Sequence, residues 1–399
     1  MFHASAHDDS AQALSGTVRR GGFIAVLLSL ALLLAALAPV SSAGAKKVPK
    51  SFFGLAQGGA ADAKDYKKMG DIEVRTFRLS VIWRAVEPRQ GVFNWSRIDG
   101  QVGALANNGI TPVVRIWGAP AWATGGGNAG VPPLKGEAVH AWKTFLKAAV
   151  ERYKRGGQYW TEHPGVPQKP VEAWQIWNEP NLPKYFSKPG TSPPKPVPNT
   201  AKSYAKLVKS SDKAIQRVDK HGKVILAGLS SEAKKKKLEP NKFIKKFLKT
   251  KRIAKRFDAA ALHPYAKKIS KYKSRISKFR KVMNKGGAKR KEIWLTEVGW
   301  GSARNHRGLN KGRAGQAKLL KKSFKVTLEQ RKKWKVDKVF WFDWRDPDKA
   351  QAVGCTFCGS AGLLANNRAR KPAYRKFKHF AKLQGKGGHT TITARDNRA

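Results

Sequence analysis

The fold of this chain is decided by the stretch WQIWNEPN, Trp174–Asn181. An apolar run changes there to the polar pair Asn178-Glu179 and is then ended by Pro180, because a proline has no amide hydrogen for a sheet interior. A second stretch, IWLTEVGW (Ile293–Trp300), has the same form and carries Glu297. Both stretches are typical of buried parallel strands that present a carboxylate at their carboxyl ends.

Six similar segments occur elsewhere in the chain, and Lys-rich helical stretches separate them. The eight predicted strands are Phe52–Leu55, Val74–Leu79, Pro112–Ile116, Ala173–Trp177, Val224–Ala227, Ala259–Leu262, Ile293–Thr296 and Val339–Phe342. The stretches between them carry apolar residues three or four positions apart, as in Trp142, Phe145, Leu146 and Val150. Eight strands alternating with helices predict an α/β fold, a single (β/α)₈ TIM barrel rather than an open sheet.

The two ends of the chain differ from this pattern. Arg19 and Arg20 precede the apolar run 23–40, and small residues follow at 41–45, which indicates a signal peptide over residues 1–45. An uncleaved membrane anchor is the alternative, since the run is nearly long enough to span a bilayer. We therefore expect residues 46–383 to form the catalytic barrel and the polar, Gly-rich residues 384–399 to form a disordered tail.

The charge is extreme: 80 Lys and Arg against 26 Asp and Glu give a net charge of +54. Such a charge favours binding to polyanions and, through self-repulsion, a monomer. Nucleic acid is not the partner that we expect, because no nucleic-acid-binding motif is present and the leader indicates export. We expect an acidic cell-surface polymer, with anionic membrane lipid as the alternative.

The chain has two cysteines, Cys355 and Cys358, in a C-x-x-C arrangement. In an exported protein this spacing favours a short local disulfide. Free thiols or a redox or metal site are the alternatives, although a redox pair would usually lie near the start of a βαβ unit. No further ligands for a metal are visible nearby, and we expect neither a metal nor a cofactor.

The two carboxylate stretches resemble the paired motifs of the large (β/α)₈ clan of retaining glycoside hydrolases. That clan has its acid/base after strand 4 and its nucleophile after strand 7, and here Glu179 follows the fourth predicted strand and Glu297 the seventh. Within the clan, the chain is most similar to family 39 and next to the cellulase-like family 5, over roughly residues 50–382. The resemblance implies that Glu179 is the acid/base and Glu297 the nucleophile.

Other residues match the clan at its strand ends. The resemblance implies that Asn178 binds the sugar 2-hydroxyl, that Arg78 and Tyr265 hold Glu297 ionised, and that His263 lines the site. It also implies a sugar-stacking tryptophan at the end of the last strand, and alternation favours Trp341 over Trp344 for this role. The alternatives are an ordinary ion pair for Arg78 and purely structural roles for the aromatic residues and the histidine.

Together these features predict a secreted or cell-surface retaining glycosidase that cleaves a cell-wall or extracellular polysaccharide by double displacement. The alternative function is a cationic, non-catalytic protein that binds carbohydrate or polyanion at the cell surface. The dense lysine run Lys234–Lys237 would be its binding patch.

Overall fold

The computed structural model describes residues 48–385, apart from residues 57, 60, 234, 306 and 349–354. The predicted signal peptide lies outside the described residues, and so does the predicted tail beyond Gly385. Gln384 and Gly385 still pack with the rest, because Gln384 accepts a hydrogen bond from the amide of Phe53 (2.9 Å) and the amide of Gly385 donates to Val48 (2.9 Å). Among the described helices, none is both long and apolar enough to cross a membrane.

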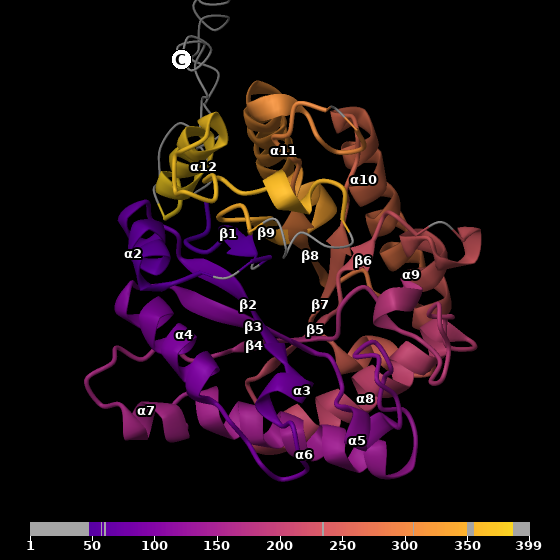
Figure 1. Cartoon of the computed structure of the whole chain (residues 1–399). Helices are drawn as coiled ribbons and strands as arrows, with labels where there is room; N and C mark the ends of the chain where they lie inside the picture. The colour runs from indigo at the N-terminus through magenta and orange to yellow at the C-terminus, as the bar shows by residue number, and fades with distance from the viewer. Residues whose placement is uncertain are drawn as a thin grey trace, which may run out of the picture. The chain divides into compact units, whose positions relative to one another are not determined.

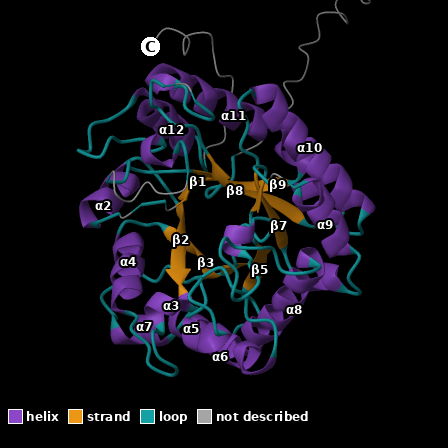
Figure 2. Ribbon diagram, turned by 45° about the vertical axis from the view of Figure 1, so that its right-hand side comes forward, coloured by secondary structure: helices purple, strands orange, loops and turns teal. Residues whose placement is uncertain are grey.

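The described strands form a closed parallel barrel (Figure 2). They are β1 (Phe53–Ala56), β2 (Thr76–Ile82), β3 (Thr111–Trp117), β4 (Ala173–Ile176), β5 (Lys223–Leu226), β6 (Leu229–Ser230), β7 (Ala259–His263), β8 (Glu292–Val298) and β9 (Val336–Trp341). The order is β5-β4-β3-β2-β1-β9-β8-β7-β6, and the pairing of β5 with β7 closes the ring. Because the short β6 continues the fifth strand, the barrel has eight strands. The predicted TIM barrel is confirmed.

Helices surround the barrel (Figures 1 and 2). They are α2 (Ala63–Asp71), α3 (Trp83–Val86), α4 (Ser96–Asn107), α5 (Ala121–Thr124), α6 (Gly136–Tyr153), α7 (Gln158–Glu162), α8 (Thr200–Val218), α9 (Pro240–Leu248), α10 (Ile269–Lys285), α11 (Gly312–Trp334) and α12 (Pro372–Lys382). Short 3₁₀ turns cover Pro183–Tyr185, Lys236–Leu238, Ile253–Arg256 and Cys358–Ser360. The apolar stripe predicted from Trp142 to Val150 is the buried face of α6.

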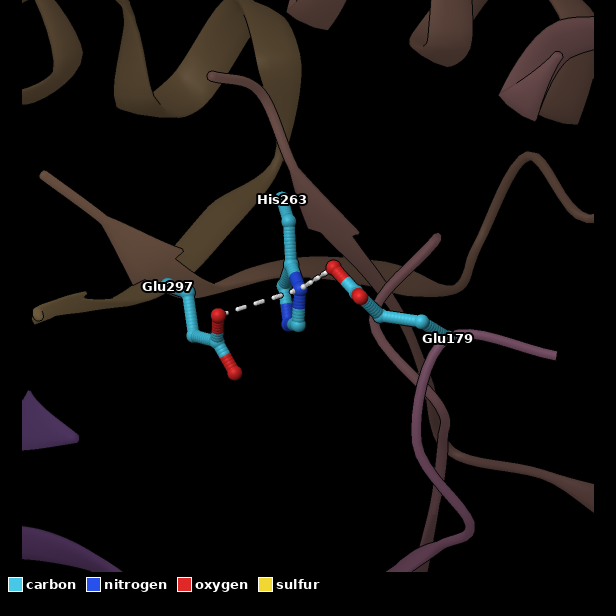
Figure 3. Close-up of side chains that lie close together, drawn as sticks. All are labelled: Glu179, His263 and Glu297. Atoms are coloured by element: carbon cyan, nitrogen blue, oxygen red, sulfur yellow. Dashed lines mark hydrogen bonds and ion pairs between the residues drawn. The ribbon is translucent and has the colours of Figure 1, made fainter. Parts of the chain in front are cut away.

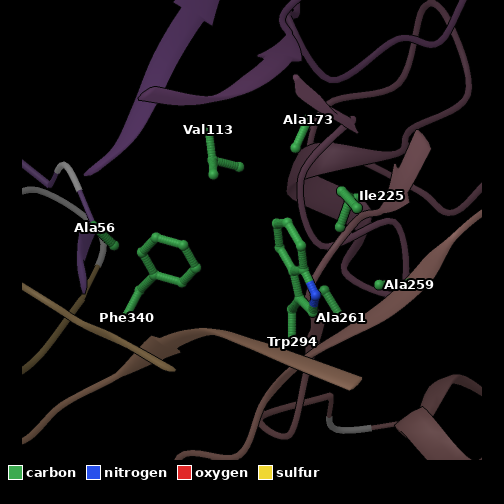
Figure 4. Close-up of a cluster of buried hydrophobic side chains, with 8 residues drawn as sticks. All are labelled: Ala56, Val113, Ala173, Ile225, Ala259, Ala261, Trp294 and Phe340. Carbon is green, nitrogen blue, oxygen red and sulfur yellow. The ribbon is translucent and has the colours of Figure 1, made fainter. Parts of the chain in front are cut away.

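The barrel interior is filled by small and large side chains that point toward one another (Figure 4). They are Ala56, Val113, Ala173, Ile225, Ala259, Ala261, Trp294 and Phe340. Since successive inward-facing residues are two positions apart, the next inward residues after Val113, Ala173 and Trp294 are Arg115, Gln175 and Thr296. The interior therefore changes from apolar to polar toward the carboxyl ends of the strands, and the apolar layer forms the floor of a polar site.

Candidate active site

The end of β4 turns sharply and presents two polar side chains to the barrel mouth. Trp177 has φ 74° and Glu179 has φ 36°, in the left-handed region that residues other than glycine seldom adopt. The Trp177 indole is fully buried and donates a hydrogen bond to the carbonyl of Tyr185, which holds this strained turn in place. The turn brings Asn178 and Glu179 to the wall of one cavity.

The end of β8 contains a bulge that has a similar effect. Leu295 pairs with Val339 and Val298 with Trp341, so β8 advances three residues where β9 advances two. Thr296 and Glu297 lie within this bulge, and both side chains reach the interior. Strict alternation would turn one of them outward, so the extra residue is what directs the carboxylate of Glu297 into the mouth.

His263, at the end of β7, lies between the two glutamates (Figure 3). Its Nδ1 is 2.8 Å from Oε1 of Glu179 and 3.4 Å from Oε2 of Glu297, while Nε2 is 3.0 Å from the hydroxyl of Thr296. One oxygen of each glutamate and one nitrogen of the histidine lie within 4.8 Å of one another. The two carboxyl groups therefore face each other across a gap of a few ångströms.

Glu297 is surrounded by positive charge and a hydroxyl donor. Arg78 donates to its Oε1 (2.7 Å), Tyr265 donates to its Oε2 (2.7 Å), and Nη1 of Arg115 lies 3.5 Å from Oε1. Burial alone would raise the pKa of Glu297, but positive charge on His263, Arg78 and Arg115 and the hydrogen bond from Tyr265 lower it to about 2. Glu297 is therefore ionised at every physiological pH.

The two arginines also fix the orientation of Asn178. Its Oδ1 accepts from Nη2 of Arg78 (3.2 Å) and from Nη1 of Arg115 (2.9 Å). The side-chain amide nitrogen of Asn178 then remains to donate to a ligand in the cavity that the residue lines. Gln175 completes the network beneath, accepting from Nε of Arg78 and donating to the carbonyl of Leu226 (2.9 Å).

These groups open into a cavity of about 520 Å³ at the barrel mouth. Besides Asn178 and the two glutamates, its lining includes aromatic, cationic and acidic side chains: Trp117, Tyr185, Tyr265, Phe342, Phe357, Arg97, Arg115, Lys184 and Glu232. Cys355 and Cys358 are joined by a disulfide, and both line the same cavity. An apolar and polar lining of this kind suits a sugar, which presents both hydroxyl groups and a C–H face.

The structure corrects three of the predicted site assignments, those of Trp341, Trp344 and His263. Trp341 and Trp344 do not line the cavity: Trp341 packs against Trp300 and Phe324, and the Trp344 indole donates to Asp65 (3.0 Å). The aromatic residue of this strand end that does line it is Phe342. His263 and Arg78 are buried behind the carboxylates and are not part of the lining, so they act on Glu179 and Glu297 rather than on a ligand directly.

Sequence reasoning missed Arg115, Gln175 and Thr296. All three are polar residues in otherwise apolar strands that face the interior next to a predicted site residue. A lone arginine in the run PVVRIW (Pro112–Trp117) was a usable signal, because a buried charge requires a partner. The contribution of Cys355 and Cys358 to the cavity had no such signal, since it depends on where these residues lie relative to the barrel mouth.

Comparison with known proteins identifies the family. The model of the glycosyl hydrolase catalytic core matches residues 158–362, which include both glutamates, His263 and the disulfide. The chain belongs to this glycosyl hydrolase family. The polar cavity at the barrel mouth is lined by both glutamates of the matched region and is the candidate active site of this hydrolase. No curated protein matches the sequence of this hydrolase.

Several solved glycoside hydrolases have a similar fold. A family 39 glycoside hydrolase from Bacteroides cellulosilyticus WH2 superposes with a TM-score of 0.60 at 21% identity, over 84% of this chain and 64% of that one. A family 39 β-xylosidase from Caulobacter crescentus gives 0.60 at 19% identity, over 86% and 73%. A subfamily 18 member of family 5 from Streptomyces cattleya, in complex with GlcNAc, gives 0.59 at 16% identity, over 84% and 80%. This hydrolase thus spans less than two thirds of the Bacteroides enzyme.

Glu179, His263 and Glu297 are also the described residues whose donor atoms lie close enough to hold a metal ion. The surrounding charge argues against this use. Arg78 and Arg115 lie against Glu297 and would repel a cation, and Nε2 of His263 already contacts Thr296. The cluster suits a pair of carboxylates with separate acid and nucleophile roles better than it suits a metal.

Proposed function

We propose that the protein is a retaining glycosidase that cleaves O-glycosidic bonds with Glu297 as nucleophile and Glu179 as acid/base. One observation carries the proposal: carboxylate oxygens of the two residues lie within 4.8 Å of each other. Retaining enzymes place the two carboxyl groups about 5–5.5 Å apart, whereas inverting enzymes separate them by about 6.5–9.5 Å to admit a water molecule.

In the first step, an oxygen of Glu297 attacks the anomeric carbon while the bond from that carbon to the leaving oxygen breaks. Glu179 gives its proton to the leaving oxygen, so a free alcohol and a glycosyl ester on Glu297 result. His263 occupies Oε1 of Glu179, which leaves Oε2 to face the leaving group. The low pKa of Glu297 supports its role because a nucleophile must be ionised before it attacks.

In the second step, Glu179 takes a proton from water as the water oxygen attacks the anomeric carbon. The ester bond to Glu297 breaks, and the sugar leaves with its original configuration after two inversions. Asn178 is placed to bind the 2-hydroxyl, since Arg78 and Arg115 hold its carbonyl oxygen and leave its amide nitrogen toward the cavity. That contact strengthens as the transition state forms.

The decisive experiment labels the nucleophile. The purified protein is incubated with a panel of 2-deoxy-2-fluoro glycosides with activated leaving groups, covering xylo, gluco, manno, galacto and idurono sugars. We expect an intact-mass increase with one of these sugars, mapped by peptide analysis to Glu297. An adduct on another residue would overturn the assignment. If no sugar labels the protein, depolymerisation assays on polysaccharides distinguish an endo-enzyme from a barrel that only binds.

We further propose that the protein is exported and acts as a monomer, and that its substrate is an acidic polysaccharide of the cell wall or the extracellular matrix. Arg97 and Lys184 line the active site without touching either catalytic carboxylate, and the chain carries +54 charges. Such a surface concentrates a polyanion near the site. Activity on an acidic polymer should then fall steadily as salt rises, while equal rates on a neutral glycan at all salt concentrations would contradict this substrate class.

The alternative function, a non-catalytic protein that holds carbohydrate or polyanion at the cell surface, is favoured by the net charge alone. It predicts binding without turnover in the same assays. It also predicts that replacing Lys234–Lys237 abolishes cell association while leaving hydrolysis intact.

A further inference from the structure

A second hollow lies on the helical wall of the barrel and shares no lining residue with the active site. It measures about 500 Å³ and forms where α6 packs against α8 and where α8 packs against the 3₁₀ turn Ile253–Arg256. The helices α6 and α8 both lie in the lower part of Figure 1, and they pack against each other. We call it the lysine groove; its charged lining is Lys143, Lys206, Lys209, Lys213, Lys251, Arg252 and Arg256.

The charge of the lysine groove is largely unbalanced. Its remaining lining residues, Val139 and Ser210, carry no charge. Among the described residues, the only ion pair made by the seven cations is that of Arg256 with Asp212, at 2.9 Å. Like charges that converge on a concave surface repel one another, and an anion placed there relieves the repulsion.

The lysines of α8 follow the helical repeat. Lys206, Lys209 and Lys213 are three and four positions apart, which places them on one face of the helix. Lysines at this spacing usually form only a solvent-exposed helix face, and this chain has many such lysines. The lysine groove differs because cations from α6 and from the segment after α9 converge on the same face and enclose a volume.

The composition of the lining indicates the class of ligand. It contains no aromatic side chain, so it offers no surface on which a nucleic-acid base or the C–H face of a neutral sugar could stack. Recognition there must come from charge. Since the chain is a glycoside hydrolase, the polyanion that suits its fold is a glycan, whose carboxylate or sulfate groups repeat along an extended chain.

We propose that the lysine groove is a non-catalytic binding site for an acidic polysaccharide chain. The site would hold the polymer on the helical wall while the active site acts elsewhere on it or on a neighbouring chain. The proposal does not depend on the catalytic roles of Glu179 and Glu297, because its test measures binding, which would persist if the labelling experiment above failed.

The test compares two triple variants that remove the same charge. Lys206→Gln/Lys209→Gln/Lys213→Gln alters the groove, and Lys278→Gln/Lys281→Gln/Lys285→Gln alters three exposed lysines of α10 that have the same three-and-four spacing and line neither cavity. Binding to dextran sulfate is measured by titration at several salt concentrations, with neutral dextran of the same length as the reference ligand.

We expect the groove variant to lose roughly tenfold in affinity for dextran sulfate and to show a shallower salt dependence, since each of three exposed ion pairs contributes about twofold. The α10 variant should lose less than about twofold, as expected for long-range charge alone. Equal losses in both variants would overturn the proposal, because binding would then follow net charge. So would binding of neutral dextran as tight as that of dextran sulfate.

A footprint on the unaltered protein provides a second test that does not depend on variants. Lysines are acetylated briefly with and without dextran sulfate, and the modified peptides are quantified by mass spectrometry. We expect protection of Lys206, Lys209 and Lys213 and none of Lys278, Lys281 and Lys285. Uniform protection would contradict a defined site. Displacement of the glycan by polyphosphate of equal charge at a lower concentration would show that the groove binds phosphate polymers instead.

Discussion

The carboxyl ends of β4 and β8 each bring one glutamate to the same cavity, yet the two carboxylates have different surroundings. Glu297 receives hydrogen bonds from Arg78 and Tyr265 and lies 3.5 Å from Arg115. Among the described residues, the carboxylate of Glu179 has one hydrogen-bond partner, Nδ1 of His263 at 2.8 Å. The chemical group is the same, so the different roles proposed for Glu179 and Glu297 must come from the environment that each strand end provides.

The backbone irregularities that end the two strands differ as well. β4 redirects its chain with two residues at positive φ, whereas β8 uses a bulge that turns two consecutive side chains inward. Both irregularities interrupt a regular strand at the position of a glutamate that faces the cavity. The strand ends therefore supply the carboxylates, while residues from other strands set the charge and hydrogen bonding around each one.

The largest effect should follow the change Glu297→Ala. With no group to attack the anomeric carbon, turnover of an aryl glycoside should fall by about five orders of magnitude. Initial rates measure the loss, using the sugar identified by labelling. Added azide should restore some turnover through a single displacement, giving a glycosyl azide of inverted configuration by NMR. A product of retained configuration would show that the roles of the two strand ends are exchanged.

The change Glu179→Ala should cost less and depend on the leaving group. A substrate with a poor alcohol leaving group should lose about a thousandfold, because it needs the proton, while a dinitrophenyl glycoside should lose little in its first step. Azide should here give a glycosyl azide of retained configuration, since the ester on Glu297 still forms. Equal losses for both leaving groups would contradict an acid role for Glu179.

The change Tyr265→Phe tests whether the neighbours assign the role. Tyr265 donates to Glu297 and helps to lower its pKa, so its removal should raise that pKa and cost about tenfold to a hundredfold in kcat/KM, as for a hydrogen bond to a charged group. Because Glu297 must be ionised to attack, the acidic limb of the pH profile should move to higher pH. Tyr185→Phe is the control: Tyr185 lines the same cavity, and among the described contacts it does not bond to Glu297. An unmoved limb in the Tyr265 variant would contradict the argument.

Much of this architecture was predictable from the sequence. The eight predicted strands all occur, because buried parallel strands are continuous apolar runs and stand out between helical stretches. The observed bounds of the strands differ most from the predicted ones where pairing with neighbouring strands, rather than composition, determines them. β2 runs from Thr76 to Ile82 instead of Val74 to Leu79, and β9 begins at Val336 instead of Val339. The close approach of Glu179 and Glu297 was also predictable, because these residues lie at the ends of the fourth and seventh predicted strands (β4 and β8).

The predictions that were wrong depend on which residues of a strand face inward, and the sequence of a single strand does not reveal this. The expectation of a sugar-stacking Trp341 placed the alternation of β9 out of register by one residue: Phe340 faces the barrel interior and Phe342 lines the cavity, so Trp341 between them packs outward. The bulge in β8 changes the count by one residue, so Thr296 and Glu297 both face inward. Arg115 is visible in the sequence as an isolated charge, but its partners, Asn178 and Glu297, come from two other strands.

A third strand-end carboxylate provides the smallest and most independent test. Asp343 follows β9, is buried, and accepts hydrogen bonds from the amides of Gly59 (2.7 Å) and Trp344 (2.5 Å). Burial raises its pKa to about 7, only partly offset by these bonds, and no arginine compensates as around Glu297. The pKa of Asp343 in the folded protein is thus above its value of about 3.9 in the unfolded chain. The contribution of Asp343 to stability is therefore greatest below about pH 3.9, and it is lost as the pH rises to about 7.

The loss should be on the order of 4 kcal/mol, or about 5 °C in Tm for a barrel of this size. Asp343→Asn should flatten this part of the pH profile of Tm, because the amide does not ionise. The control Asp71→Asn makes the same chemical change at an exposed carboxylate of α2 and should keep the wild-type slope. An unchanged slope in the Asp343 variant would mean that Asp343 is already ionised without cost near neutral pH. The strand-end environments would then differ less than the contacts of Glu297 and Asp343 indicate.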